Sequence, residues 1–123
     1  MATRSFIGIL NPDGSVSGVY CHYDGYPDGV GATLLKHYTD PTKVDALLAL
    51  GSISILDAEV GEQHSFYAPH RGWTLAYHRD RGEDFEPPMV YSTLRDMLRD
   101  VGYDLCAEWA YVFVDGKWET HEI

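Results

Sequence analysis

Two turn signals, one near each end of the chain, most constrain what the sequence can fold into. The sequence NPDG at 11–14 separates two β-prone runs near the N-terminus, and the Asp-Gly pair at 115–116 does the same near the C-terminus. Turn residues of this kind between apolar runs are among the strongest local signals for a β-hairpin. The sequence therefore predicts a hairpin at each end, with strands at 3–10, 16–22, 106–114 and 117–123.

Three segments between the hairpins have helical patterns. One spans Val30 to Tyr38, where the apolar residues fall at helical spacing. A second follows Asp40, an N-cap residue, and is expected to end at Gly51. A third has apolar residues at positions i, i+3, i+4 and i+7, with Ser92 as the expected N-cap and Gly102 at its end.

The order of these elements predicts a single α+β domain over residues 1–123. Chains of about 100 to 150 residues commonly form one domain. We expect a mostly antiparallel sheet with about three helices packed on one face. The segment Trp73–His78 has the composition of a strand, and the charged segment 79–88, which contains Gly and Pro, is expected to hold no regular element.

The charge and the apolar runs exclude several classes of partner. The net charge of -10, from 19 acidic and 9 basic residues, opposes binding to nucleic acid phosphates and favours a partner with a basic or neutral surface. No run approaches the roughly 20 apolar residues that cross a bilayer, and the N-terminus lacks a secretory pattern. We therefore expect a cytoplasmic protein that does not bind membranes.

The cysteines and histidines match no common cofactor or metal motif. Cys21 and Cys106 lie in apolar, strand-like runs and are expected to be buried free thiols. The six histidines include no HExxH pattern and no close pair with cysteine. We expect no metal and no cofactor.

The loop between the second expected strand and the first expected helix is the strongest candidate for recognition. Its sequence, YCHYDGYPDGVG, contains two turn signatures, and its glycines match no nucleotide-binding motif. Turn residues hold such a loop rigid, while tyrosine and carboxylate side chains suit contact with a partner. The predicted binding residues here are His22, Tyr23, Asp24, Tyr26 and Asp28.

A second candidate is the charged segment that follows Trp73–His78. Arg79, Arg81 and Glu83 lie in a run of alternating charge that by default is solvated surface. Exposed Arg and Tyr together are enriched in binding hot spots, so this segment becomes a candidate if it folds beside Tyr23 and Tyr26.

The residues TRSFIG, YCHYDGYPDGVGATLLKHY and RDRGED together resemble a family of small bacteriophage and prophage proteins. The shared pattern is an N-terminal TRS before a strand, a CHxDGYP signature leading into LLxHY, and a later RDRGE stretch. Tyr23 stands where the family often has Trp. The resemblance implies an accessory protein, outside the virion, that acts during infection by binding a host or defence factor.

Three functional hypotheses remain at this point. The first is a non-enzymatic protein that inhibits or sequesters a host or anti-phage defence protein. The second is a protein that sequesters a small molecule such as a signalling nucleotide, with tyrosines stacking a base and Arg4, Arg79 or Arg81 pairing phosphate. The third is a small hydrolase or transferase that uses Cys21 or the pair of His22 and Asp24.

Overall fold

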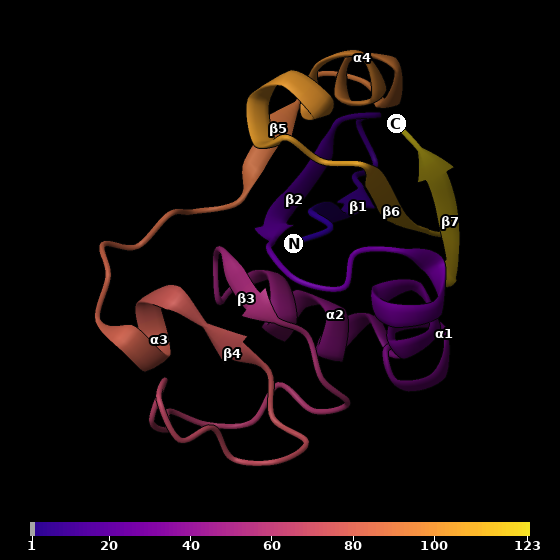
Figure 1. The fold of residues 1–123 in the computed structure, drawn as a ribbon. Coiled ribbons are helices and arrows are strands. Elements are labelled where there is room, and N and C mark those ends of the chain that lie inside the picture. The colour runs from indigo at the N-terminus through magenta and orange to yellow at the C-terminus, as the bar shows by residue number, and fades with distance from the viewer. Residues whose placement is uncertain (1) are drawn as a thin grey trace.

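The computed structural model describes residues 2–123 and confirms the α+β class. One mixed sheet of seven strands runs through the molecule, with helices packed against it (Figure 1). The strand order is β4-β3-β2-β1-β6-β7, and β5 also pairs with β2. The strands are β1 (Ser5–Leu10), β2 (Val16–Cys21), β3 (Ile53–Ile55), β4 (Leu75–Ala76), β5 (Met89–Tyr91), β6 (Trp109–Val114) and β7 (Lys117–Glu122).

Both predicted hairpins are present and most strand pairs are antiparallel, as expected. β1 pairs with β2, and β6 pairs with β7, each in an antiparallel register of six residue pairs. The two hairpins are joined through β1 and β6, which run parallel. A second parallel contact links Cys21 at the end of β2 to Ile53 of β3. The central strands therefore come from opposite ends of the chain.

The helices cover both faces of the sheet, so the expectation that they would pack on one face is wrong. α1 and α2 cover one face and α4 covers the other, as Figure 1 shows. The short α3 lies beside β4 at the edge of the sheet. The helices are α1 (Ala32–His37), which follows a π-helical turn η1 (Pro27–Gly31), α2 (Pro41–Leu48), α3 (Tyr77–Arg81) and α4 (Leu94–Leu105).

The central strands explain why both faces need a cover. Phe6 of β1 packs under α4 and its neighbour Ile7 packs under α1 and α2. In β6, Val112 packs under α4 and Tyr111 packs under α1 and α2. Strands that are apolar on both faces are typical of sheets with helices on both sides. The continuous apolar runs SFIGIL and AYVFV were the signal for this arrangement.

Two helices differ from their predicted bounds, because α2 ends at Leu48 rather than at Gly51 and α4 differs at both ends. α2 begins as predicted after Asp40, whose carboxylate accepts a hydrogen bond from the Thr42 backbone at 2.8 Å. α4 instead uses Thr93 as its N-cap rather than Ser92, with a 3.1 Å bond from the backbone of Asp96. It continues through Gly102 and ends at Leu105, because contacts of its apolar face outweigh the weak helix propensity of one glycine.

Cys106 follows α4 in the left-handed conformation, with φ of 55°, and its side chain is exposed. The expectation that Cys106 is buried within a strand is wrong, since β6 begins only at Trp109. Cys21 is buried as expected.

The predicted strand at 73–78 is reduced to β4, and helix α3 takes the next five residues. Arg79 and Arg81 therefore lie on a helix, which corrects the expectation that the charged segment holds no regular element. The carboxylate of Asp80 accepts a bond from the backbone of Ala76, where the strand ends, and Gly82 ends the helix with φ of 76°. Asp80 thus fixes the turn from strand to helix, and Gly82 ends that helix.

The loop after β2 is fixed at Gly25. The backbone N–H of Gly25 donates to the carbonyl of Thr3 at 2.8 Å, and the buried hydroxyl of Tyr111 donates to the Gly25 carbonyl at 2.6 Å. A Cβ at this position would lie 2.7 Å from the Thr3 carbonyl oxygen, so only glycine fits. The loop is therefore held to β1 and β6 rather than free to move.

We expect Tyr111→Phe to lower the free energy of unfolding by about 1 to 2 kcal/mol, because it leaves the Gly25 carbonyl without its buried donor. Urea denaturation measures the change. Tyr103→Phe is the matched control, since Tyr103 is 92% exposed, and it should change stability by less than about 0.5 kcal/mol. Equal stability of Tyr111→Phe and the control would contradict the anchoring role of this bond.

Candidate functional site

The loop that follows β2 presents its predicted residues to solvent. Tyr23 and Tyr26 are 43% and 42% exposed, and Asp24 and Asp28 are exposed. The Tyr26 hydroxyl donates to the Asp24 carboxylate at 3.2 Å. Asp24 has φ of 58°, a conformation that Asp tolerates better than most residues. These four side chains form an exposed aromatic and acidic surface on a fixed loop.

His22 lies between this loop and the sheet, in a chain of polar contacts with Arg4 and Tyr20. The guanidinium Nε of Arg4 donates to the Tyr20 hydroxyl at 3.2 Å. That hydroxyl also forms a hydrogen bond with Nδ1 of His22. Burial and the charge of Arg4 lower the pKa of His22 below its usual 6.5. The ring is therefore mostly neutral at pH 7, and its Nδ1 is engaged by Tyr20.

Tyr77, the first residue of α3, connects the opening loop with the charged segment. Burial raises the pKa of Tyr77, and the nearby phenol of Tyr23 and carboxylate of Glu83 raise it further. The guanidinium of Arg81 lies 5.7 Å from the centre of the Tyr77 ring and forms a 2.8 Å ion pair with Glu83. The two predicted segments thus meet at Tyr77, a residue that the sequence analysis placed in a strand and did not select.

Aromatic rings continue from this junction in both directions. His22 packs edge-to-face on Tyr23, with 4.4 Å between ring centres. On the other side Phe66 lies 5.7 Å from both Tyr77 and Tyr67, and Tyr67 is 85% exposed. We call this set of five rings the aromatic face: His22, Tyr23, Phe66, Tyr67 and Tyr77.

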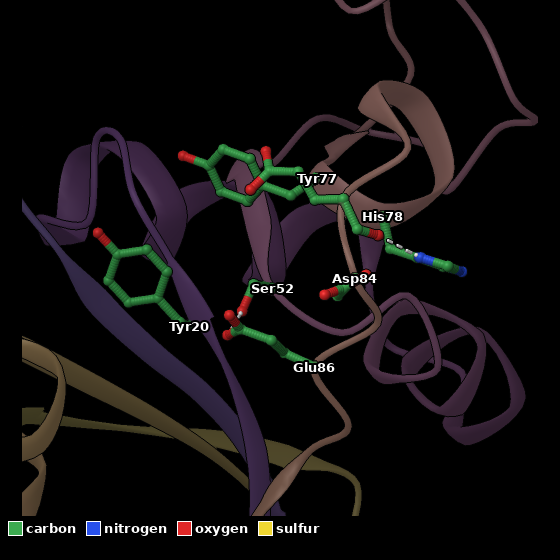
Figure 2. A pocket seen from close by; sticks show the side chains of 7 residues that line it. Tyr20, Ser52, Tyr77, His78, Asp84 and Glu86 are labelled. Carbon is green, nitrogen blue, oxygen red and sulfur yellow. Dashed lines mark hydrogen bonds between the residues drawn. The ribbon is translucent and has the colours of Figure 1, made fainter.

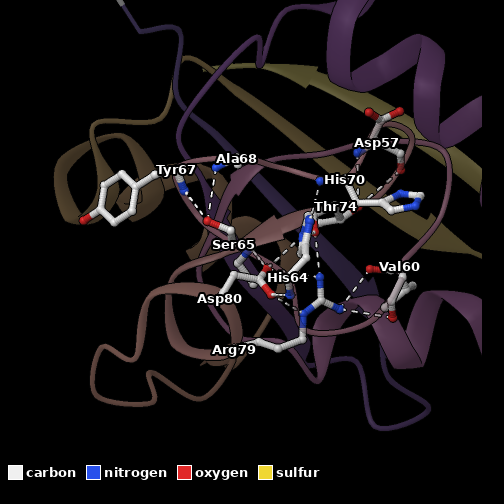
Figure 3. Close-up of polar contacts among 12 residues, drawn as sticks. Asp57, Val60, His64, Ser65, Tyr67, Ala68, His70, Thr74, Arg79 and Asp80 are labelled. Atoms are coloured by element: carbon white, nitrogen blue, oxygen red, sulfur yellow. Dashed lines mark hydrogen bonds and ion pairs between the residues drawn. The ribbon is translucent and has the colours of Figure 1, made fainter.

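The segment that carries Phe66 and Tyr67 is held by the buried carboxylate of Asp80 (Figure 3). The Asp80 side chain is fully buried and accepts hydrogen bonds from the backbone of His64 at 3.2 Å and of Ala76 at 2.8 Å. Burial alone would raise its pKa, but these bonds and the adjacent guanidinium of Arg79 lower it below 3.8. Asp80 is therefore ionised at neutral pH and connects α3 to the segment before β4.

Arg79 has a structural role in this arrangement rather than a place on the surface. Its guanidinium donates to Asp80 at 2.9 Å, to the Thr74 carbonyl at 2.6 Å and to the Val60 carbonyl at 2.9 Å. These contacts occupy both edges of the planar group (Figure 3). We therefore remove Arg79 from the candidate site and keep Arg81 and Glu83, which lie at its border.

A cavity of about 150 Å³ opens between β2, α3 and the segment that leads to β5 (Figure 2). Tyr20 and Tyr77 stand on its walls, and three carboxylates line it. The sequence analysis missed most of this cavity, because its residues come from four separate segments. They are Tyr20, Ser52, Tyr77, His78, Glu83, Asp84 and Glu86.

The geometry does not assemble a catalytic set from the predicted residues. Cys21 is fully buried, and burial raises its pKa to about 12, so the thiol remains protonated at neutral pH. The His22 ring is hydrogen-bonded through Nδ1 to Tyr20, and in residues 2–123 it forms no hydrogen bond with Asp24, its predicted partner. Among residues 2–123 no group of three or more His, Cys, Asp or Glu side chains is placed to hold a metal ion.

The part of the chain that the structure describes contains no helix long and apolar enough to cross a bilayer. No protein-family model, curated protein or solved structure matches the chain.

The environment of His22 gives a testable pH dependence. A proton NMR titration is expected to give a pKa below 6.5, and Arg4→Gln should raise it, because the lost positive charge no longer opposes protonation of the ring. As the pH falls, His22 therefore binds a proton at a higher pH in the unfolded chain than in the folded chain. The contribution of His22 to folding stability is therefore present above pH 6.5 and is lost as the pH falls through the folded pKa. A wild-type pKa above 6.5 would contradict the assignment.

Proposed function

We propose that this chain is a bacteriophage accessory protein, outside the virion, that binds and inhibits a host or anti-phage defence protein in the host cytoplasm. The observation that carries the proposal is the convergence of the opening loop and α3 into one exposed aromatic face with acidic neighbours. Tyrosine and arginine are enriched in binding hot spots. Here Phe66 adjoins both Tyr67 and Tyr77, and the guanidinium of Arg81 lies 4.9 Å from the centre of the Phe66 ring.

The charge of the chain supports a partner with a basic or neutral surface. The net charge of -10 steers a basic protein toward the complex and repels nucleic acid. Asp24 and Asp28 lie close enough to the Tyr26 hydroxyl to raise its pKa, which places two carboxylates beside a tyrosine on the loop that also carries Tyr23. A partner with exposed Arg or Lys matches both the rings and the carboxylates.

The other two hypotheses have less support. Nucleotide binding needs free cations, but Arg79 is bound to backbone carbonyls, Arg81 is paired with Glu83, and Arg4 contacts Tyr20. Catalysis by Cys21 needs a thiolate, which burial disfavours, and His22 forms no hydrogen bond with Asp24, its predicted partner. A binding protein without enzymatic activity is the function that agrees with all of these contacts.

The test is recovery of the tagged chain from infected cells, followed by native mass spectrometry of the complex. We expect a complex with a host-encoded protein, and a loss of at least about tenfold in recovered partner for Tyr23→Ala and Tyr67→Ala. Tyr103→Ala is the matched control, because Tyr103 is 92% exposed on α4, at the other end of the molecule from α3 (Figure 1).

The control variant should recover the partner as well as the wild-type chain does. Recovery of the chain without any protein partner would refute the proposal. A partner that is lost equally in Tyr103→Ala would place the interface elsewhere.

A further inference from the structure

The cavity between β2, α3 and residues 83–86 has a chemistry that specifies its occupant. We infer that it binds an alkylguanidinium cation, supplied as an arginine side chain of the partner protein. The inference rests on the proposed function, because it names the group that the partner inserts beside the aromatic face. It is carried by the cavity's concave shape, its aromatic walls and its uncompensated charge together.

The charge in the cavity is negative and not neutralised within the chain. Glu83 is paired with Arg81 at 2.8 Å. By contrast, Asp84 and Glu86 form no ion pair with any side chain in residues 2–123. The Glu86 carboxylate receives one neutral hydrogen bond, from the Ser52 hydroxyl at 3.0 Å. Two carboxylates with spare acceptor capacity favour a cation and repel an anion.

The walls add the second part of the specificity. Tyr20 and Tyr77 border the same space as the carboxylates of Asp84 and Glu86 (Figure 2). Burial raises the pKa of both phenols, so both stay neutral at physiological pH. A neutral phenol ring attracts a cation placed against its face, and a guanidinium also stacks on such rings.

A narrower apolar cleft of about 30 Å³ adjoins the cavity and is the third feature that favours an arginine side chain. It shares Tyr20, Ser52 and Glu86 with the cavity. Its further walls are the side chains of Pro87, Met89 and Leu105. A charged head in the cavity can therefore extend an aliphatic stem over apolar atoms, which is how an arginine or lysine side chain divides between charge and hydrocarbon.

The acidic segment is held in place before any ligand arrives. Nδ1 of His78 donates to the Glu83 carbonyl at 2.6 Å, and the His78 ring packs edge-to-face on Phe85 at 5.3 Å. At Gly51, a Cβ would lie 2.4 Å from the Glu86 carbonyl oxygen, so this glycine allows the two backbones to meet. A preformed site avoids the cost of ordering a loop during binding.

These features favour guanidinium over ammonium. Carboxylates and phenols line the same cavity, and the planar guanidinium presents five N–H donors in fixed directions. Ammonium is a compact, strongly hydrated charge, and it loses more hydration for fewer directed bonds.

The experiment is an NMR titration of the full chain with Nα-acetyl-arginine-methylamide. We expect a Kd of about 1 mM or tighter, with amide shifts at Tyr20, Ser52 and Tyr77. The citrulline analogue has the same shape without the charge and should bind at least about tenfold more weakly. Three results would each overturn the inference: equal binding of the two compounds, amide shifts elsewhere on the chain, or no binding of the arginine derivative at about 10 mM.

Two variants that each remove one negative charge distinguish binding in the cavity from attraction by the net charge of the chain. Glu86→Gln should weaken binding by about tenfold or more while the chain keeps its fold, because Glu86 is exposed. Glu122→Gln on β7, three strands away from β2 in the sheet, should leave binding unchanged. The same loss in both variants would mean that the net charge alone attracts the ligand, which contradicts a defined site.

A further comparison identifies the source of the cation. n-Butylguanidinium has the head and the stem without the peptide groups, and it should bind no more tightly than the arginine derivative. Tighter binding by about tenfold would indicate a free small molecule and overturn the assignment to a partner protein. If no guanidinium binds, but Tyr23→Ala and Tyr67→Ala still lose the partner, the proposed function stands and this inference fails.

Discussion

The candidate site depends on the buried carboxylate of Asp80. It accepts hydrogen bonds from the backbone of His64 and of Ala76, and it pairs with Arg79. Through these contacts one side chain fixes the end of β4, the start of α3 and the segment before β4. Removing a partner from a buried ion pair typically costs about 3 to 5 kcal/mol, so loss of Asp80 or Arg79 is expected to destabilise this part of the fold.

The position of α3 then determines what the surface offers. Tyr77 follows directly after Ala76, and so the bond to Asp80 that fixes Ala76 also brings the Tyr77 ring toward Tyr23 and Tyr20 on the β2 side. On its other side, Tyr77 contacts Phe66. The chain leaves α3 at Gly82 and returns to the sheet as β5, which pairs with β2, and the acidic segment lies between α3 and β5 (Figure 1). An aromatic face and an acidic cavity thus arise from one structural junction.

Local signals predicted the parts of the fold that local physics decides. The NPDG and Asp-Gly turns, and the Asp40 cap with Pro41, need only neighbouring residues, and each is found as expected. The sequence could not show that Arg79 turns inward, since that depends on carbonyls of residues such as Val60 that lie far away along the chain. The exposed loop residues were predictable because they are neighbours in the sequence. The cavity was not, because Tyr20, Ser52 and Glu86 meet only in the folded chain.

Hydrogen exchange of Asp80→Asn tests the central claim most directly, because Asn keeps the shape of the side chain and removes its charge. The account predicts at least about tenfold faster exchange at the amides of His64 and Ala76 and across residues 57–86, with β1 and β6 protected as in the wild-type chain. Unchanged protection of those two amides, or an equal loss throughout the sheet, would show that Asp80 does not hold this half of the molecule together.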